Sequence, residues 1–195
     1  TGCSDTEEIT VAFAVVTPVL TLASTSNATR CTPPNGSITV AVSPDTPADY
    51  TFSWYNGASV KATPDFPDTD ETLSGLPAGT YTVKAINNLR HCETQPITVT
   101  IINTAPAITF NQTGIVRPAK CNDNNGSLTV AVNAAGNVSG FDFEWRLGQP
   151  PFLANAITTT NNTATTTTAT ALEAGIYTLI ATNRDNGCTA SQTFD

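Results

Sequence analysis

The residues best suited to chemistry in this 195-residue sequence are its five cysteines, Cys3, Cys31, Cys92, Cys121 and Cys188. They form no CxxC pair, and His91 is the only histidine. A zinc site needs a full set of Cys or His ligands, so no metal is expected at these residues. Cysteines without a metal pattern are typical of disulfides, which persist in oxidising compartments. The cysteines therefore predict a disulfide-bonded protein of an oxidising compartment.

Two acidic stretches, "PDFPDTDE" at 64–71 and "CNDNNG" at 121–126, are the other candidates. Their oxygens suit Ca²⁺, but neither stretch has the spacing of an EF-hand loop. Solvated loops with Asx turns are the simpler interpretation, with Asp68, Asp70 and Asp123 as weak candidates if calcium binds. His91 is expected to be an exposed turn residue, and one histidine cannot serve two repeats as a catalytic base. We expect no other cofactor, no catalytic residue and no enzyme activity.

An internal repeat organises the sequence. "CTPPNGSITVAV" from Cys31 matches "CNDNNGSLTVAV" from Cys121, and "LPAGTYTVKAINN" at 76–88 matches "LEAGIYTLIATNR" at 172–184. Residues 2–13 resemble 91–101, the end of the first copy. We therefore expect the end of a preceding repeat plus a linker at 1–17, then repeats at 18–103 and 104–195. The chain is accordingly interpreted as a piece of a longer tandem array.

The repeats read as β-sheet. Apolar and polar residues alternate along 37–42, 80–85 and 97–101, and turn signals such as "PPNG" and "LPAG" separate the strands. About seven short strands per repeat, with Trp on the third, predict tandem immunoglobulin-like antiparallel β-sandwiches. The tyrosine after each Gly turn is expected at a tyrosine corner. The residues expected to define the fold are Trp54, Trp145, Tyr81, Tyr177, Gly79 and Gly175.

The cysteine pairing has two solutions. Pairing within each repeat gives Cys31–Cys92 and Cys121–Cys188, leaves Cys3 for an upstream partner, and is favoured because each repeat is then self-contained. In the standard immunoglobulin strand order, however, the turn before the second strand and the turn after the sixth strand, which carry the two cysteines of each pair, lie at opposite ends of a sandwich. The rival pairing, Cys3–Cys31 and Cys92–Cys121, has matched separations of 28 and 29 residues and joins neighbouring repeats.

The composition disfavours some classes of binding partner. Eight basic against sixteen acidic residues give a net charge of −8, which disfavours nucleic acid and anionic membranes. No apolar run reaches membrane-spanning length. Sugar-binding modules stack their ligands on exposed aromatic rings. Only Tyr55 and Phe66 among the aromatic residues are expected at the surface, so a lectin function has little support. Six sequons offer possible glycosylation if the host modifies them: Asn27, Asn35, Asn111, Asn125, Asn137 and Asn161.

The combined motifs resemble a known family. A cysteine before "NGS-[IL]-T-V", a Trp strand, "L-x-A-G-x-Y" and a late cysteine resemble the SprB-type repeats of giant Bacteroidota surface adhesins. "RDNGC" at 184–188 fits the late-cysteine motif of that family, and "NLRHC" at 88–92 differs from it. The resemblance implies export, display in long fibres and no catalytic residues.

The sequence therefore predicts a non-enzymatic structural or adhesive module of an extracellular fibre. Its expected partners are neighbouring copies of itself, and possible further partners are surface glycans or other cells. Two alternatives stay open. One is a glycan- or calcium-binding module of a secreted multi-domain protein. The other is a pilin-like subunit that donates its N-terminal strand, "EEITVAFAVV", to the next subunit.

Overall fold

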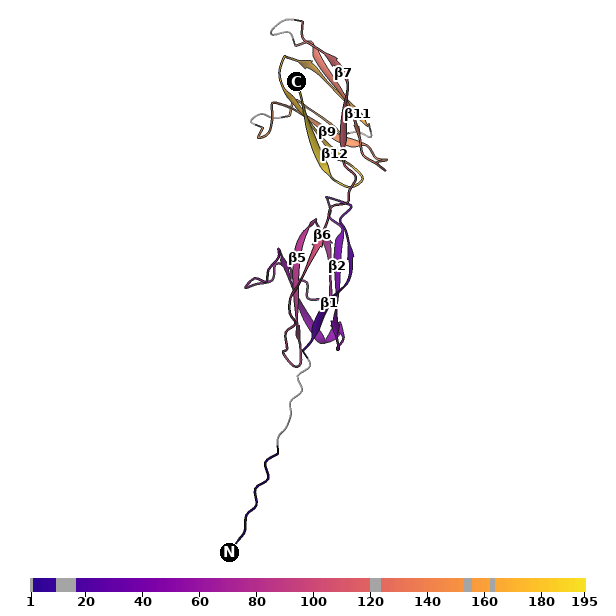
Figure 1. Cartoon of the computed structure of the whole chain (residues 1–195). Helices are drawn as coiled ribbons and strands as arrows, with labels where there is room; N and C mark the ends of the chain where they lie inside the picture. The colour runs from indigo at the N-terminus through magenta and orange to yellow at the C-terminus, as the bar shows by residue number, and fades with distance from the viewer. Residues whose placement is uncertain (1, 10–16, 120–123, 153–155, 162–163) are drawn as a thin grey trace.

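The protein consists of two β-sandwich domains placed end to end (Figure 1). The computed structural model describes residues 2–9, 17–119, 124–152, 156–161 and 164–195. Within these residues the one helical element is a 3-10 turn at Pro47–Asp49. No described helix has the length and apolarity needed to cross a bilayer.

The first domain packs two three-stranded antiparallel sheets. One sheet has the order β1-β2-β4 and the other β3-β5-β6. Every strand pair in both sheets is antiparallel. The strands are β1 (Val19–Ser26), β2 (Gly36–Ser43), β3 (Tyr50–Asn56), β4 (Thr72–Leu76), β5 (Gly79–Asn87) and β6 (Ile97–Ile101).

The second domain repeats this arrangement with one more strand. Its sheets have the orders β11-β8-β7 and β10-β9-β12-β13. The strands are β7 (Thr109–Val116), β8 (Gly126–Asn133), β9 (Phe141–Leu147), β10 (Thr158–Asn161), β11 (Thr166–Leu172), β12 (Tyr177–Asn183) and β13 (Thr189–Phe194). The immunoglobulin-like sandwich predicted from the sequence is confirmed in both domains.

The expected seventh strand is missing among the described residues of the first domain. Where the second domain has β10, residues 57–71 of the first form a loop that returns along β3. Asp65 N–H donates to Trp54 O at 3.0 Å, and Phe52 N–H donates to Thr69 O at 3.0 Å. The loop thus supplies some of the hydrogen bonds of an edge strand without its regular register.

Each domain has its own core, centred on a tryptophan that is fully shielded from solvent. Alternation along β2 and β8 buries every second side chain, because one face of each sheet packs on the other sheet. Trp54 Nε1 donates to Asp70 O at 3.0 Å and Trp145 Nε1 to Thr167 Oγ1 at 3.2 Å. The indole N–H groups are therefore satisfied inside the cores.

Both domains contain a tyrosine corner. The Tyr81 hydroxyl donates to Pro77 O at 2.8 Å, and the Tyr177 hydroxyl donates to Glu173 O at 2.9 Å. Burial raises the pKa of both phenols. Gly79 and Gly175 precede these tyrosines, and neither has the left-handed backbone that a tight entry would need.

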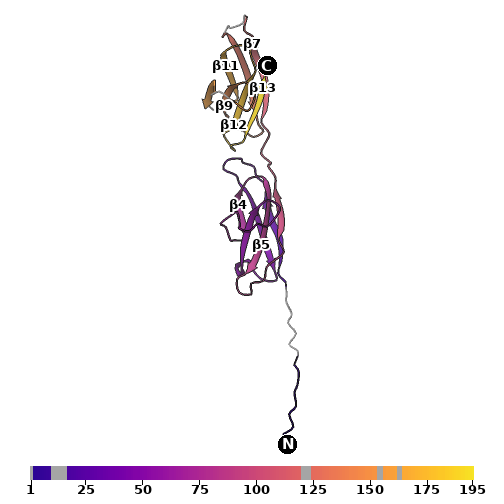
Figure 2. The ribbon, with the colours of Figure 1, turned by 90° about the vertical axis from the view of Figure 1, so that its left-hand side faces the viewer.

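The strand directions place the turns at defined ends. The β1–β2 turn of the first domain faces the second domain, and the β5–β6 turn lies at the opposite end, near the start of β1 (Figures 1 and 2). Residues 2–9 form no strand in the described structure and extend away from the first domain. The rest of the strand that the sequence predicts within 1–17 falls on residues 10–16, which lie outside the described residues.

Candidate functional site

The β1–β2 turn that carries Cys31 is built around an asparagine side chain. Asn35 Oδ1 accepts hydrogen bonds from the N–H groups of Thr29 at 2.9 Å and Arg30 at 3.1 Å. Its Nδ2 donates to Thr29 Oγ1 at 2.8 Å. An isolated bridge between Cys31 and Pro34 closes the turn. These bonds fix Cys31 at the end of the first domain that faces its neighbour.

The β12–β13 turn that carries Cys188 uses a buried asparagine in the same way. Asn183 N–H donates to Cys188 O at 2.8 Å, and Asn183 Oδ1 accepts from Asp185 N–H at 2.9 Å. Gly187 N–H donates back to Asn183 O at 2.8 Å. The φ of Gly187 is 69°, a left-handed conformation that favours glycine.

The two turns meet and form a covalent junction between the domains. Cys31 and Cys188 are joined by a disulfide with a Cα–Cα distance of 4.8 Å. Asn186 O accepts hydrogen bonds from Cys31 N–H at 2.8 Å and Thr32 N–H at 3.2 Å. A β-carbon on Gly187 would lie 2.6 Å from Thr32 O. The junction is therefore close enough to require glycine for steric as well as conformational reasons.

The peptide linker is tied down beside this disulfide. Ala28 N–H donates to Ile102 O at 3.0 Å, and Thr104 N–H donates to Ala28 O at 2.8 Å. Asn27 Oδ1 accepts from Ile102 N–H at 3.2 Å. Two covalent connections, one through the linker and one through the disulfide, thus join the domains, and together they restrict rotation of one domain against the other.

The favoured pairing of Cys31 with Cys92 and of Cys121 with Cys188 is wrong. The β1–β2 turn, which carries Cys31, and the β5–β6 turn, which carries Cys92, lie at opposite ends of the first domain, and Cys31 is bonded to Cys188 instead. The rival scheme was right that a disulfide joins neighbouring repeats, but its pair Cys3–Cys31 is also wrong. Cys3 and Cys92 are free, and Cys121 lies outside the described residues.

The weak calcium candidates do not form a site in the described residues. Asp68 and Asp70 are exposed, and Asp123 lies outside these residues. No group of three or more metal-ligating side chains occurs in the part of the chain that the structure describes. Tyr55, expected at the surface, is only 2% exposed, and Phe66 packs against Tyr81 with ring centroids 6.0 Å apart. Tyr55 therefore offers no open ring face of the kind that stacks on a sugar, and Phe66 is half-buried.

The sequons differ in how free their amide groups are. Asn35 Nδ2 is engaged in its turn, and Asn137 Nδ2 donates to Gly140 O at 3.0 Å and Asn183 Oδ1 at 2.8 Å. The side chains of Asn27, Asn111 and Asn125 are exposed, and that of Asn161 lies outside the described side chains. Since a glycan attaches to Nδ2, glycosylation at Asn35 or Asn137 would break bonds that shape the turns.

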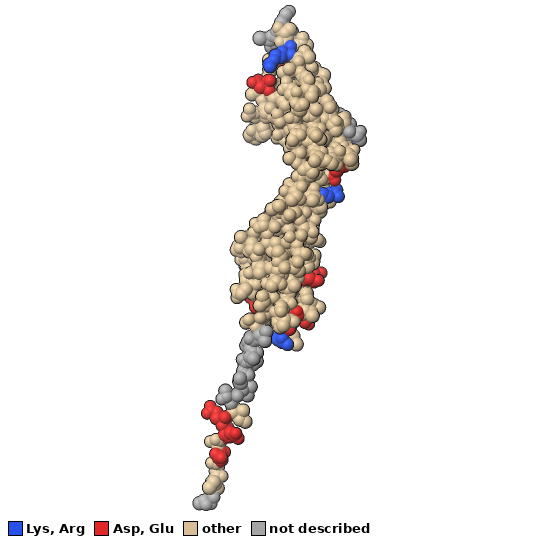
Figure 3. Space-filling view, turned by 45° about the vertical axis from the view of Figure 1, so that its right-hand side comes forward, with Lys and Arg blue, Asp and Glu red and all other residues tan. Residues whose placement is uncertain are grey.

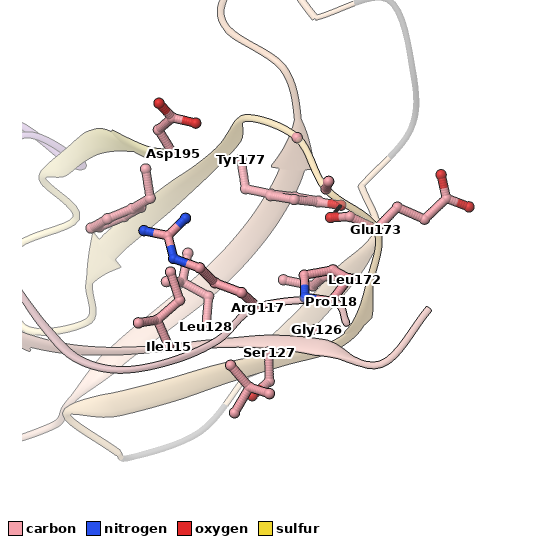
Figure 4. Close-up of a pocket in the computed structure, with 14 residues that line it drawn as sticks. Ile115, Arg117, Pro118, Gly126, Ser127, Leu128, Leu172, Glu173, Tyr177 and Asp195 are labelled. Carbon is pink, nitrogen blue, oxygen red and sulfur yellow. Dashed lines mark hydrogen bonds between the residues drawn. The ribbon is translucent and has the colours of Figure 1, made fainter. Parts of the chain in front are cut away.

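A pocket of about 290 Å³ opens at the far end of the second domain (Figure 4). Leu128, Leu172 and Tyr177 line its floor, and Arg117 points across it. In the first domain the corresponding space holds Ile101, which pairs with Gly79 and is 1% exposed. The pocket therefore lies where the first domain buries a residue of its last strand.

Charge is sparse on the face of both domains shown in Figure 3, and acidic side chains stand out on the N-terminal segment. Among the few charged side chains, Asp185 has a structural role at the end of the second domain that faces the first. Its Oδ2 accepts Val138 N–H at 2.7 Å. Hydrogen bonds from the Ser139 side chain and from Val138 N–H hold the pKa of Asp185 below its ordinary value.

Sequence reasoning missed the junction, although one signal was present. "RDNGC" and "NLRHC" differ at all four residues before the cysteine, and the last of the four in "RDNGC" is the glycine packed on Thr32. A glycine is one of the residues found where another backbone approaches closely, so Gly187 was the available signal.

The sequence is similar to one known family over part of the first domain. The SprB repeat family matches residues 23–59, which include the Cys31 turn, β2 and β3, and this confirms the resemblance seen in the motifs. No curated protein matches the chain.

Several solved structures are similar over most of the chain. Three N-terminal domains of the outer capsid protein Hoc of bacteriophage RB49 share 16% identity, with a TM-score of 0.36 over 91% of this chain. The chain spans 57% of that Hoc structure. The fibronectin(III)-like modules of Clostridium thermocellum CbhA share 18% identity, with a TM-score of 0.34, covering 90% of this chain and 91% of theirs. A marsupial T cell receptor shares 11%, with a TM-score of 0.33, covering 91% and 70%.

Proposed function

We propose that this protein is a non-enzymatic structural module of an extracellular fibre, in which sandwich domains joined in series carry load or present an adhesive surface. The observation that carries the proposal is the disulfide between Cys31 and Cys188, which joins two successive domains. A bridge between repeats has a mechanical role, because it limits how far and in which direction one repeat can turn on the next.

The disulfide closes a long loop. Cys31 and Cys188 are separated by 157 residues, so the closed loop contains most of both domains. In the chain-entropy description, closing a loop of this length destabilises the unfolded chain by about 5 kcal/mol. The same closure prevents the enclosed strands from being drawn out when the two ends of the chain are pulled. The module is thereby protected against both thermal and mechanical unfolding.

Three further features support an extracellular location and a structural role. Disulfides of this kind persist outside the reducing cytosol. A family of repeats, the SprB repeat, matches residues 23–59 of the first domain. The exposed sheet faces carry threonine pairs, such as Thr129 with Thr168 at 2.9 Å and Thr182 with Thr189 at 3.0 Å. Hydrogen-bonded sheet faces of this type suit a long surface fibre.

Electron microscopy of the native material, before any proteolysis, tests the proposal. A fibre of these domains should show a regular repeat of roughly 35–45 Å, the length of strands of seven to ten residues plus a linker. Isolated compact particles would contradict a fibre. A thermal midpoint that rises with calcium, or retention of the chain on a glycan array, would favour the alternative of a ligand-binding module.

A further inference from the structure

We infer that the pocket at the far end of the second domain is a binding groove for an extended peptide segment of a partner protein. The segment brings one branched aliphatic side chain into the groove and carries no acidic residue beside it. The inference goes beyond the proposed structural role, because it names a kind of partner and its test does not require a fibre.

The first domain shows what fills the corresponding groove. There β6 continues along β5 as far as the pair Gly79–Ile101, and the Ile101 side chain is buried. Its Cγ2 atom lies 2.9 Å from the position of a β-carbon on Gly36. The counterpart of Gly36 is Gly126, which lines the pocket of the second domain. The occupant in the filled repeat is thus an extended strand with a branched aliphatic side chain.

The second domain has the walls of this groove without the strand that fills it. The last pair between β12 and β13 is Tyr177–Phe194, which is two residues short of Gly175, the counterpart of Gly79. In the described structure no strand pairs with Gly175. A strand end without a partner, beside an apolar hollow, is the arrangement to which peptides add as a further strand.

The opposite wall offers a second backbone contact. In the first domain Ala28 N–H donates to Ile102 O at 3.0 Å, and Ala28 O accepts Thr104 N–H at 2.8 Å. The counterpart of Ala28, 90 residues on, is Pro118, which lines the pocket. Proline has no N–H group, but its carbonyl can accept a hydrogen bond. An occupant can therefore donate a backbone N–H to this wall as Thr104 does.

Arg117 supplies the donor that Pro118 lacks. It stands where the first domain has Asn27, and its side chain points across the pocket (Figure 4). It takes part in none of the ion pairs formed between described residues. A guanidinium group only donates hydrogen bonds, so it suits a backbone carbonyl of the occupant.

The rim of the groove is more apolar than the same end of the first domain. At three exposed positions the second domain has an aliphatic residue and the first a polar one: Ile115, Val116 and Leu147 against Thr25, Ser26 and Asn56. Leu147 Cδ1 lies 3.7 Å from the position of a β-carbon on Gly175, so this patch is continuous with the groove. Exposed aliphatic side chains around a hollow are typical of a protein interaction site.

Charge decides which segment fits. Glu173 and Asp195 line the pocket. In the described N-terminal segment, residues 2–9, two glutamates directly precede Ile9, and they would be repelled by these carboxylates. We therefore assign the groove to a segment of a separate protein with the chemistry of residues 98–105, "TVTIINTA", which carries no charge.

The test measures binding of a labelled peptide of residues 98–105, with blocked ends, to the full oxidised chain by fluorescence anisotropy. We expect saturable binding that weakens about tenfold or more when the peptide carries Ile101→Asn, because a branched side chain is no longer buried. With a photoactivatable leucine in place of Ile101, the crosslinks should fall on tryptic peptides 121–146 and 147–184, which contain Leu128 and Tyr177.

Two extended chains serve as matched controls. Addition of the tripeptide Ile-Ile-Asn after Asp195 should fill the groove from within the chain. This extension should raise the thermal midpoint of the protein and abolish binding of the peptide. Addition of Ser-Ser-Asn at the same place should leave both the midpoint and the binding as in the wild type.

Several results would overturn the inference. They are no binding of the peptide, equal binding of the two peptides, crosslinks on the first domain, and binding that survives the Ile-Ile-Asn extension. Self-association of the wild-type chain that this extension abolishes would also overturn it, because the occupant would then be a second copy. None of these results depends on the Cys31–Cys188 junction, so failure of the groove is distinguishable from failure of the proposed function.

Discussion

The interdomain disulfide should make the oxidised protein almost inextensible. The perturbation is reduction of the Cys31–Cys188 bridge while the chain is pulled from residues 1 and 195 in an optical trap. A chain of 195 residues spans at most ~660 Å at about 3.4 Å per residue. The bridge removes 157 residues from the path between the ends, so the oxidised chain reaches only ~130 Å even when every strand is unfolded.

Reduction should therefore lengthen the stretched chain by ~530 Å. Other pairings predict other lengths. The pair Cys31–Cys92 with Cys121–Cys188 removes 61 and 67 residues and predicts a gain of ~430 Å. The pair Cys3–Cys31 with Cys92–Cys121 removes 28 and 29 and predicts ~190 Å. Cys188→Ser should behave as the reduced protein without any reductant, and Cys92→Ser should behave as the wild type. A gain near either alternative length would refute the junction described above.

Three further predictions concern single side chains. Gly187→Ala should lower the free energy of unfolding by more than Gly136→Ala. Both substitutions place a β-carbon at positive φ, which costs about 1–2 kcal/mol of stability. Only the β-carbon at residue 187 also meets Thr32. Tyr177→Phe should destabilise the second domain by about 1 kcal/mol through loss of the hydroxyl bond to Glu173 O. Asp185→Asn should remove part of the loss of stability in acid. The folded-state pKa of Asp185 is lowered, so its carboxylate contributes its full stability above the ordinary carboxyl pKa. That contribution is lost as the pH falls through the folded-state pKa.

Urea titrations measure the first two predictions, and thermal midpoints from pH 2 to 6 measure the third. Equal effects of the two alanine substitutions would contradict the close contact at the junction. A Tyr177→Phe protein as stable as the wild type would mean that the corner bond contributes nothing net. Parallel pH curves for Asp185→Asn and the wild type would show that this carboxylate does not support the turn.

The fold was accessible from the sequence because its signals are local. Alternation along 37–42 and 127–132 places Val40 and Val130 in the cores, and both are fully buried. Tyr81 follows "LPAG" and forms the corner that this phrase predicts. Tyr55 was misplaced because it was judged exposed from the alternation of β3 alone. The loop at 57–71, whose path the alternation does not specify, folds back over this part of β3.

The disulfide was not accessible in the same way. Cysteine spacing measures separation along the chain, whereas pairing depends on which ends of the sandwich the turns occupy. The turns that carry Cys31 and Cys92 belong to one repeat but lie at its opposite ends, while Cys188 is brought to Cys31 by end-to-end stacking of the domains. Strand order decides the ends, and the stacking depends on a linker whose bonds involve side chains such as Asn27.

The measurement that tests the central claim most directly is disulfide mapping of the unreduced protein. Trypsin places each of the five cysteines on a separate peptide, because lysine or arginine residues lie between all of them. We predict a linked pair of peptides 31–61 and 185–195, which one reduction step separates. Peptide 31–61 linked to 91–120, or 185–195 linked to 121–146, would contradict the interdomain junction and the mechanical role built on it.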